Sequence, residues 1–89
     1  MAAGAGKQIV TALQTHSESH VVAMRGCLAI SDLARASKSA RASLMAEGAG
    51  VQVLAALSKH AEHAEAAAMS CRALWHLALD SAGAEALVP

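Results

Sequence analysis

Residues 71–78 read Cys-Arg-Ala-Leu-Trp-His-Leu-Ala, and residues 27–34, which lie 44 positions earlier, read Cys-Leu-Ala-Ile-Ser-Asp-Leu-Ala. Cysteine, alanine, leucine and alanine recur in place, and an isoleucine corresponds to a leucine. The same register continues without a gap and pairs residues 5–45 with residues 49–89. The chain therefore contains an internal repeat, and a fixed period of this length is typical of repeat architectures.

The matches between the two copies are not an effect of composition. Fifteen of the 41 aligned pairs are identical, and 24 of the 89 residues are alanine. Alanine explains some of the identities, but not those at glycine, glutamine, histidine, glutamate and cysteine. We therefore predict one domain, residues 1–89, with a first repeat of about residues 5–48 and a second of about residues 49–89.

The composition favours helices and does not indicate a nucleic-acid or membrane partner. Trp75 is the only aromatic residue. A core of mainly alanine and leucine suits close helix packing better than a sheet. Residues 1–48 carry five basic and three acidic residues (+2), and residues 49–89 carry two and four (−2). This asymmetry is too small to indicate a nucleic-acid or membrane partner.

The sequence has no targeting or membrane segment that we can identify. No apolar run approaches the roughly 18 residues of a membrane span, and no basic start precedes an apolar block as in a signal peptide. Cys27 and Cys71 occupy equivalent positions on apolar helix faces. We predict free, buried thiols rather than a disulfide, which indicates an intracellular, cytoplasmic location.

Apolar spacing predicts three helices in the first repeat. A short helix over residues 7–15 is followed by a long helix over about residues 19–36, with Ser19 as its cap. A second short helix is expected to start at Ser37 or Ser39 and to end near Ala46.

The second repeat has the same predicted order. Gly48 and Gly50 are expected to stop the preceding helix, because glycine ends helices at low steric cost. A short helix over residues 51–59 and a long helix over residues 64–79 then follow. A last short helix is predicted from Asp80 or Ser81 to Pro89. No strand pattern competes, so the predicted fold class is all-α.

Two stretches of the second repeat resemble the armadillo repeat. Residues 50–57 match its pattern Gly-x-x-Val-Leu-x-x-Leu, and residues 73–78 match Ala-Leu-x-x-Leu-Ala. HEAT repeats are less similar, since they have two helices and lack the separate short helix. The resemblance implies a right-handed α-solenoid of three-helix repeats, with the long helices lining a concave groove that binds partners in extended form.

On that layout the last short helix belongs to an incomplete further repeat. Each solenoid unit buries its faces against its neighbours, and about three units are usually needed. The resemblance therefore indicates a fragment or a terminal pair, with apolar end faces exposed unless something covers them.

The groove residues differ from those of the nuclear-import receptors of this family. Those receptors carry a tryptophan and an asparagine one turn apart on successive long helices. The tryptophan positions here correspond to Leu28 and Arg72, and the asparagine positions to Asp32 and His76, so binding of a basic localisation signal is not expected. The outward-facing residues of the two long helices either bind a peptide through hydrogen bonds and an Arg–carboxylate contact, or form a solvated helix face. The candidate protein-binding residues are Arg25, Leu28, Asp32, Arg35, Met69, Arg72, Trp75, His76 and Leu79.

Trp75 and the histidines each have a structural alternative. Trp75 lies beside the groove, where it either packs against a following repeat or anchors a partner. His16 and His60 are repeat-equivalent turn residues, and His20 and His63 lie one turn onward. Because no cysteine pair or carboxylate cluster has ligand spacing, we interpret the histidines as helix caps and expect no metal ion.

No catalytic pattern is present in the sequence. Residues 4–7 lack the strand and the spacing of a phosphate-binding loop. Cys71 and His76 point to different faces of one helix, so they cannot act as a nucleophile and its base. We predict a non-enzymatic scaffold without a cofactor that binds a peptide or protein segment along the groove. The alternative is a self-assembly unit whose end faces pair into homo-oligomers or extended solenoids.

Overall fold

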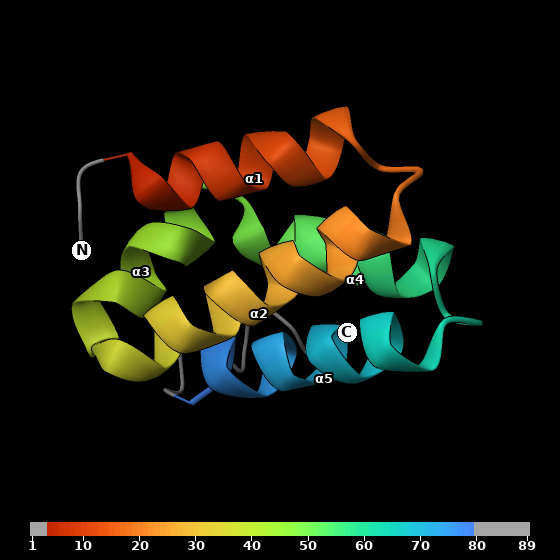
Figure 1. Cartoon of the computed structure of the whole chain (residues 1–89). Coiled ribbons are helices and arrows are strands. Elements are labelled where there is room, and N and C mark those ends of the chain that lie inside the picture. The colour runs from red at the N-terminus through yellow and green to blue at the C-terminus, as the bar shows by residue number, and fades with distance from the viewer. Residues whose placement is uncertain (1–3, 80–89) are drawn as a thin grey trace.

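The computed structural model describes residues 4–79, and all regular elements in that range are α-helices (Figure 1). The all-α class predicted from the sequence is confirmed. The five helices are α1 (Ala5–Thr15), α2 (His20–Ala36), α3 (Lys38–Ala46), α4 (Ala49–Lys59) and α5 (Ala64–Leu77).

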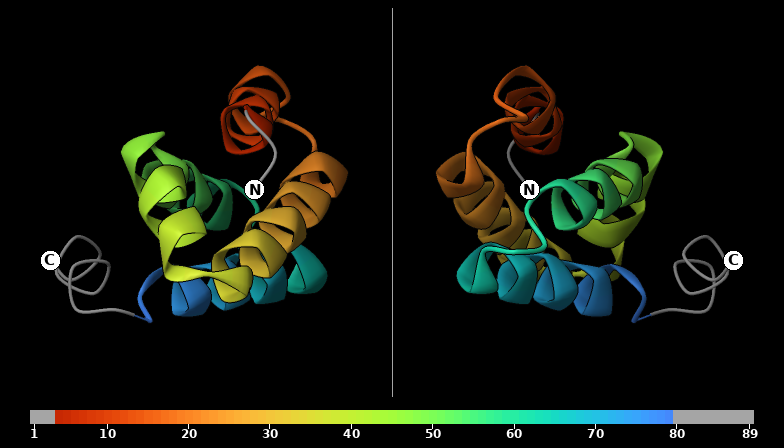
Figure 2. Two further views of the ribbon diagram at one scale, coloured as in Figure 1. Left: turned by 90° about the vertical axis from the view of Figure 1, so that its left-hand side faces the viewer. Right: turned by 90° about the vertical axis from the view of Figure 1, so that its right-hand side faces the viewer.

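The helices repeat with the period of the sequence. α1 and α4 begin at Ala5 and Ala49, and α2 and α5 begin at His20 and Ala64, so each pair is offset by 44 residues. α1 and α4 run in one direction, while α2 and α5 run in the other (Figure 1). The described chain is therefore a helical hairpin, α1–α2, joined through α3 to a second hairpin, α4–α5. In the end views α1 and α5 lie at opposite edges with α2 between them (Figure 2).

Serine side chains start two of the helices. Ser19 Oγ accepts a hydrogen bond from the Val22 amide at 3.2 Å, and Ser37 Oγ accepts one from the Ala40 amide at 2.9 Å. Each bond satisfies a backbone N–H that has no partner within the first helical turn. Ser19 is thus confirmed as a cap, and Ser37, of the two serines predicted, starts the third helix.

Gly48 separates α3 from α4 with a φ of +87°. The sequence predicted that residues 48–50 would stop one helix and that the next would begin at Val51. This was wrong by two residues, since α4 begins at Ala49 and Gly50 is buried within it. One residue in the left-handed region is sufficient to redirect the chain, and glycine adopts that conformation without steric cost.

Two other helix boundaries also differ from the prediction. α1 begins at Ala5, directly after Gly4 with a φ of +82°, rather than at residue 7. α5 ends at Leu77 rather than at residue 79, and the Leu79 amide bonds to the His76 carbonyl in a tighter closing turn. The short helix predicted after residue 79 lies outside the described residues.

The core is centred on the contact between α2 and α5. Cys27, Ile30, Ala34, Ala73 and Leu77 have no exposed surface. Small side chains at such a contact let two helix backbones approach closely while the larger ones fill the space between them. Leu44 of α3 and Val53 of α4 are equally buried and close the core.

Gly26 allows a similarly close approach of α1 to α2. A Cβ atom at this position would lie 2.8 Å from Cδ2 of Leu13, which is closer than van der Waals contact permits. The Leu13 side chain therefore sits directly over the α2 backbone.

We expect Gly48→Ala to lower the free energy of unfolding by about 1–2 kcal/mol, because an L side chain is strained in the left-handed region. No neighbouring atom lies within 4 Å of the place that the added Cβ would occupy, so crowding adds nothing. Gly48→Asn should cost less, since asparagine tolerates this conformation. Urea unfolding followed by circular dichroism measures both variants, and an unchanged Gly48→Ala midpoint would contradict the assignment.

Candidate functional site

Four of the predicted groove residues share one face of α2. Arg25, Leu28, Asp32 and Arg35 are all exposed, as the sequence predicted. Nη2 of Arg35 lies 3.7 Å from Oδ1 of Asp32. Both side chains are more than half exposed, so solvent screens this ion pair and it contributes little to stability.

The equivalent face of α5 is less open than predicted. Arg72 and Leu79 are exposed, whereas Met69 and His76 are half-buried. Met69 packs against the hydrophobic core instead of lying free in a groove. The two rows occupy equivalent positions on neighbouring helices that run in the same direction, and we call them together the α2/α5 strip. It comprises Arg25, Leu28, Asp32, Arg35, Met69, Arg72, His76 and Leu79.

His76 connects the strip to the contact between the long helices. Its Nδ1 lies 2.8 Å from Oγ of Ser31 and 3.0 Å from the Arg72 carbonyl oxygen. Because a carbonyl oxygen only accepts, this geometry assigns the proton to Nδ1. Ser31 is fully buried, a burial that the sequence did not indicate. One edge of the imidazole is therefore already used inside the protein and is not available to a partner.

Trp75 and Cys71 lie together on the outer flank of α5. The Trp75 side chain is 68% exposed, whereas its repeat equivalent, Ser31, is fully buried. Cys71 is free and exposed, so the prediction that both thiols are buried was wrong for Cys71. The reason is positional: the same face of α2 is covered by α5, and within the described residues no helix covers this face of α5.

Cys27 is the buried thiol. Its Sγ lies 3.5 Å from Oγ of Ser70, and that hydroxyl donates to the Ala66 carbonyl at 2.8 Å. Burial raises the pKa of the Cys27 thiol, and the contact with Ser70 opposes this shift only in part. Cys27 is therefore kept as a neutral thiol, a form that is a poor nucleophile.

We expect the two cysteines to react at very different rates with iodoacetamide. Native protein should take up one adduct, at Cys71, because Cys27 has no exposed surface and only the thiolate reacts. Two adducts should appear in denaturant. Mass spectrometry of tryptic peptides shows which cysteine is labelled first. Equal labelling of both cysteines in native protein would contradict the packing of α5 on α2.

The turn histidines fix the ends of the hairpins. His16 and His60 follow the last residues of α1 and α4, and their amides bond to the carbonyls of Ala12 and Ala56. Their predicted position at the helix ends is confirmed, but the bonds that close these ends come from the backbone amides and not from the imidazole rings. His60 has a further role: its Nε2 donates to the Ser17 carbonyl at 2.8 Å. This bond ties the second hairpin to the turn of the first.

A second pair of histidines stacks across the same two turns. The rings of His20 and His63 lie 4.1 Å apart and within 9° of parallel. Among residues 4–79 no three histidine, cysteine or acidic side chains are grouped so that they could hold a metal ion. The stack thus contributes packing between the turns.

An ion pair also joins the two turns. Lys59 pairs with Glu18, and this contact lowers the pKa of the Glu18 carboxyl through the hydrogen bond to the ammonium group. The Glu18 side chain is largely exposed, so the ion pair adds little to stability.

We expect His60→Ala to lower the free energy of unfolding by about 1 kcal/mol or more, because it leaves the Ser17 carbonyl without its partner. His16→Ala is the matched control, since His16 occupies the equivalent position but is exposed. Thermal denaturation at one pH compares the two variants. If the two variants are destabilised equally, the hydrogen bond from His60 to the Ser17 carbonyl does not stabilise the packing of the two hairpins.

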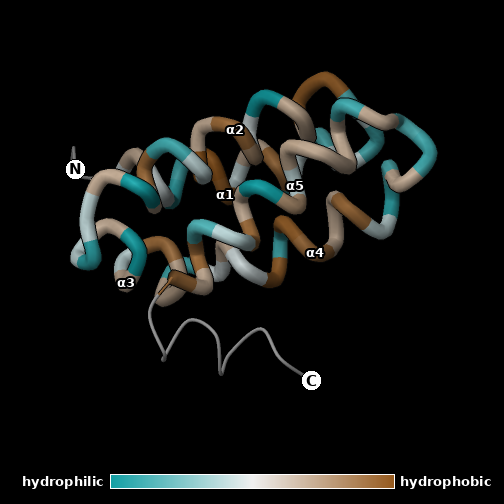
Figure 3. The backbone as a smooth tube through the Cα atoms, turned by 90° about the horizontal axis from the view of Figure 1, so that it is seen from below, coloured by the Kyte–Doolittle hydropathy of each residue, from teal (hydrophilic) through white to brown (hydrophobic). Residues whose placement is uncertain are grey.

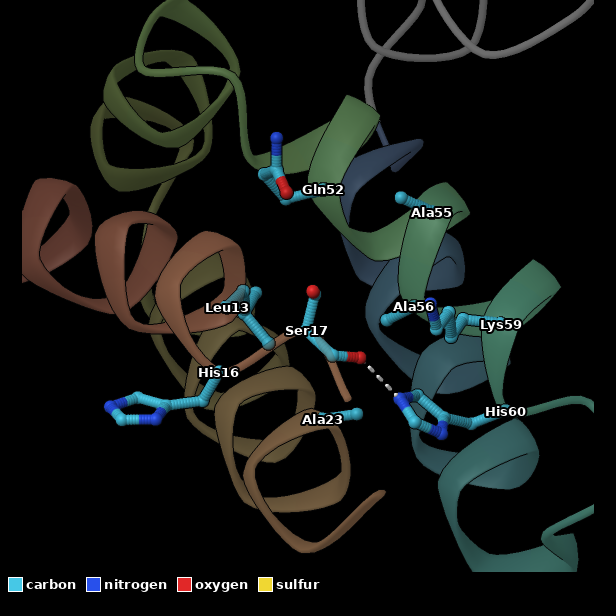
Figure 4. Close-up of a pocket in the computed structure, with 9 residues that line it drawn as sticks. All are labelled: Leu13, His16, Ser17, Ala23, Gln52, Ala55, Ala56, Lys59 and His60. Carbon is cyan, nitrogen blue, oxygen red and sulfur yellow. Dashed lines mark hydrogen bonds between the residues drawn. The ribbon is translucent and has the colours of Figure 1, made fainter. Parts of the chain in front are cut away.

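A small pocket of about 80 Å³ lies between α1, the start of α2 and α4 (Figure 4). Its walls are mainly apolar, with Leu13, Ala23 and Ala56 among them. His60 points into the space toward Ser17, while His16 points away from it (Figure 4). The pocket has room for little more than a few water molecules. Its histidine is already bonded to a backbone carbonyl, so it is not poised as a base.

No protein family matches the sequence, and neither a curated protein nor a solved structure matches the chain. Among the described residues no helix combines the length and the hydropathy required to cross a bilayer.

Proposed function

We propose that this chain is a non-enzymatic, armadillo-type interaction module that binds an extended peptide segment along the α2/α5 strip. The observation that carries the proposal is the pair of long helices, which run side by side and present equivalent residues on one face. Backbones at a fixed spacing offer a periodic row of side chains, which suits a partner that is itself extended and periodic.

The charge of the strip favours an acidic segment. Its three arginines, Arg25, Arg35 and Arg72, outnumber its one carboxylate, Asp32, and that carboxylate is already paired with Arg35. Arg25 and Arg72 make no ion pair within residues 4–79. An arginine fork without a partner matches a carboxylate in two parallel hydrogen bonds. Leu28 and Leu79 supply apolar contacts beside these charges.

The polar groups near the strip support binding rather than catalysis. Ser31 and His76 form a hydroxyl–imidazole pair, but the hydroxyl has no exposed surface and a substrate could not reach it. Cys71 is exposed, yet His76 is directed to Ser31 on the other side of α5. A nucleophile must be reachable and within hydrogen-bond distance of its base.

We expect Arg72→Glu to weaken binding of a fluorescent peptide of alternating glutamate and leucine by about tenfold or more, because it removes one charge-assisted contact and adds repulsion. Lys7→Glu is the control, since Lys7 is exposed and lies outside the strip. Fluorescence anisotropy measures both, with a lysine–leucine peptide as the opposite-charge probe. Equal loss in both variants, or tighter binding of the lysine peptide, would contradict the proposal.

A further inference from the structure

The core of this protein lies at the contact between its two repeats. The surface that the first repeat contributes to this contact has an equivalent on α4 and α5, and there it is not covered by another repeat. Val10, Cys27 and Ser31 of the first repeat are 6%, 0% and 0% exposed because the second repeat covers them. Their equivalents 44 residues later are uncovered. Leu54 is 44% exposed, Trp75 is 68% exposed and Cys71 is also exposed. We call Leu54, Cys71 and Trp75 the forward face.

The other half of the same contact recurs unpaired on α1 and α2. Ala49, Val53, His60 and Ser70 of the second repeat are buried against the first. Their equivalents are half-buried at three positions and exposed at the fourth. We call these equivalents, Ala5, Ile9, His16 and Gly26, the backward face.

We infer that a second copy of this chain docks head to tail, with its backward face on the forward face of the first copy. The structure indicates why the partner is a second copy. The forward face is equivalent to the surface of the first repeat that the second repeat covers, and a second copy would supply a hairpin of the same sequence pattern to cover it. Neither face includes a residue of the α2/α5 strip, of which only Asp32 lies at the edge of the docked contact. The inference therefore goes beyond the proposed peptide binding and does not depend on it.

Two of the polar contacts between the repeats can recur between copies. His60 donates to the Ser17 carbonyl, and the equivalent pair is His16 of the second copy with the Ala61 carbonyl. The acceptor is backbone, so the change from serine to alanine does not remove it. The contact of Ser31 with His76 becomes Trp75 with Asp32 of the second copy, an indole N–H facing a carboxylate.

The contact between two copies should be weaker than the contact between the two repeats of one chain, because several residues differ between the equivalent positions. The ion pair of Lys59 with Glu18 has no equivalent, because the corresponding residues are Thr15 and Glu62. The indole of Trp75 is also much larger than the Ser31 side chain. The smaller Asp32 in place of His76 provides part of the room it needs. Association should therefore depend on protein concentration.

The geometry does not close at a dimer. The contact joins two different sets of residues, the forward face of one copy and the backward face of the next, whereas a two-fold rotation would place the same set of residues on both sides. Each added copy presents a new forward face, which is the property of a heterologous interface. α4 carries strongly hydrophobic segments (Figure 3), and Leu54 among its residues is 44% exposed.

The first test compares two exposed apolar residues of α4. Leu54 lies on the forward face, whereas Val51 is 68% exposed and is equivalent to Lys7, which stays exposed although the repeats pack together. In sedimentation velocity of the full chain over a hundredfold range of concentration, the average mass should rise past that of a dimer. Leu54→Glu should abolish this rise, and Val51→Glu should leave it unchanged.

The second test mixes variants that are blocked on opposite faces. His16→Glu buries an unpaired carboxylate on the backward face, and Leu54→Glu blocks the forward face. Each variant alone should stay a monomer, and their mixture should give a one-to-one heterodimer that grows no further. Circular dichroism melting of each variant verifies that it is folded.

Four outcomes would overturn the inference: a wild-type mass that never exceeds the monomer, an association insensitive to Leu54→Glu, equal loss in Val51→Glu, or no heterodimer in the mixture. None of these variants alters the α2/α5 strip. Peptide binding can therefore fail while stacking persists, and stacking can fail while peptide binding persists.

Discussion

The close packing of α5 on α2 is the constraint on which the rest of the structure depends. Cys27, Ser31, Ser70 and Ala73 meet there with no exposed surface. Because these side chains are small, the helices approach closely, and the larger Ile30 and Leu77 fill the core beside them. A bulky residue at this contact would separate the hairpins.

That packing also decides which surfaces remain for partners. It takes the Nδ1 edge of His76 into the contact and leaves Arg25, Arg72 and the paired Asp32 and Arg35 in solvent. Two kinds of surface result: a polar, arginine-rich side on the long helices, and a more apolar face at Leu54, Cys71 and Trp75. These differ in chemistry, so they favour different partners.

Repeat equivalence shows why the two copies of one pattern are not interchangeable. His60 bonds across to Ser17, whereas His16 is exposed, and Cys27 is buried, whereas Cys71 is exposed. In each pair the residue type is the same and the neighbour differs. Sequence reasoning assigned both members of a pair one environment, and it failed at Cys71 for that reason. The contact between Ser31 and His76 had no sequence signal, since serine and histidine are usually found at surfaces.

The sequence by itself determined the order of the described helices, their period of 44 residues and the cap at Ser19, because spacing and capping are local properties of the chain. It also placed Arg25, Leu28, Asp32 and Arg35 on one exposed face. Only the tertiary structure decided which of two equivalent residues is covered, and that Met69 and His76 are half-buried. Those outcomes depend on what lies next to a helix in space, and a periodic pattern is identical whether or not a neighbour is there.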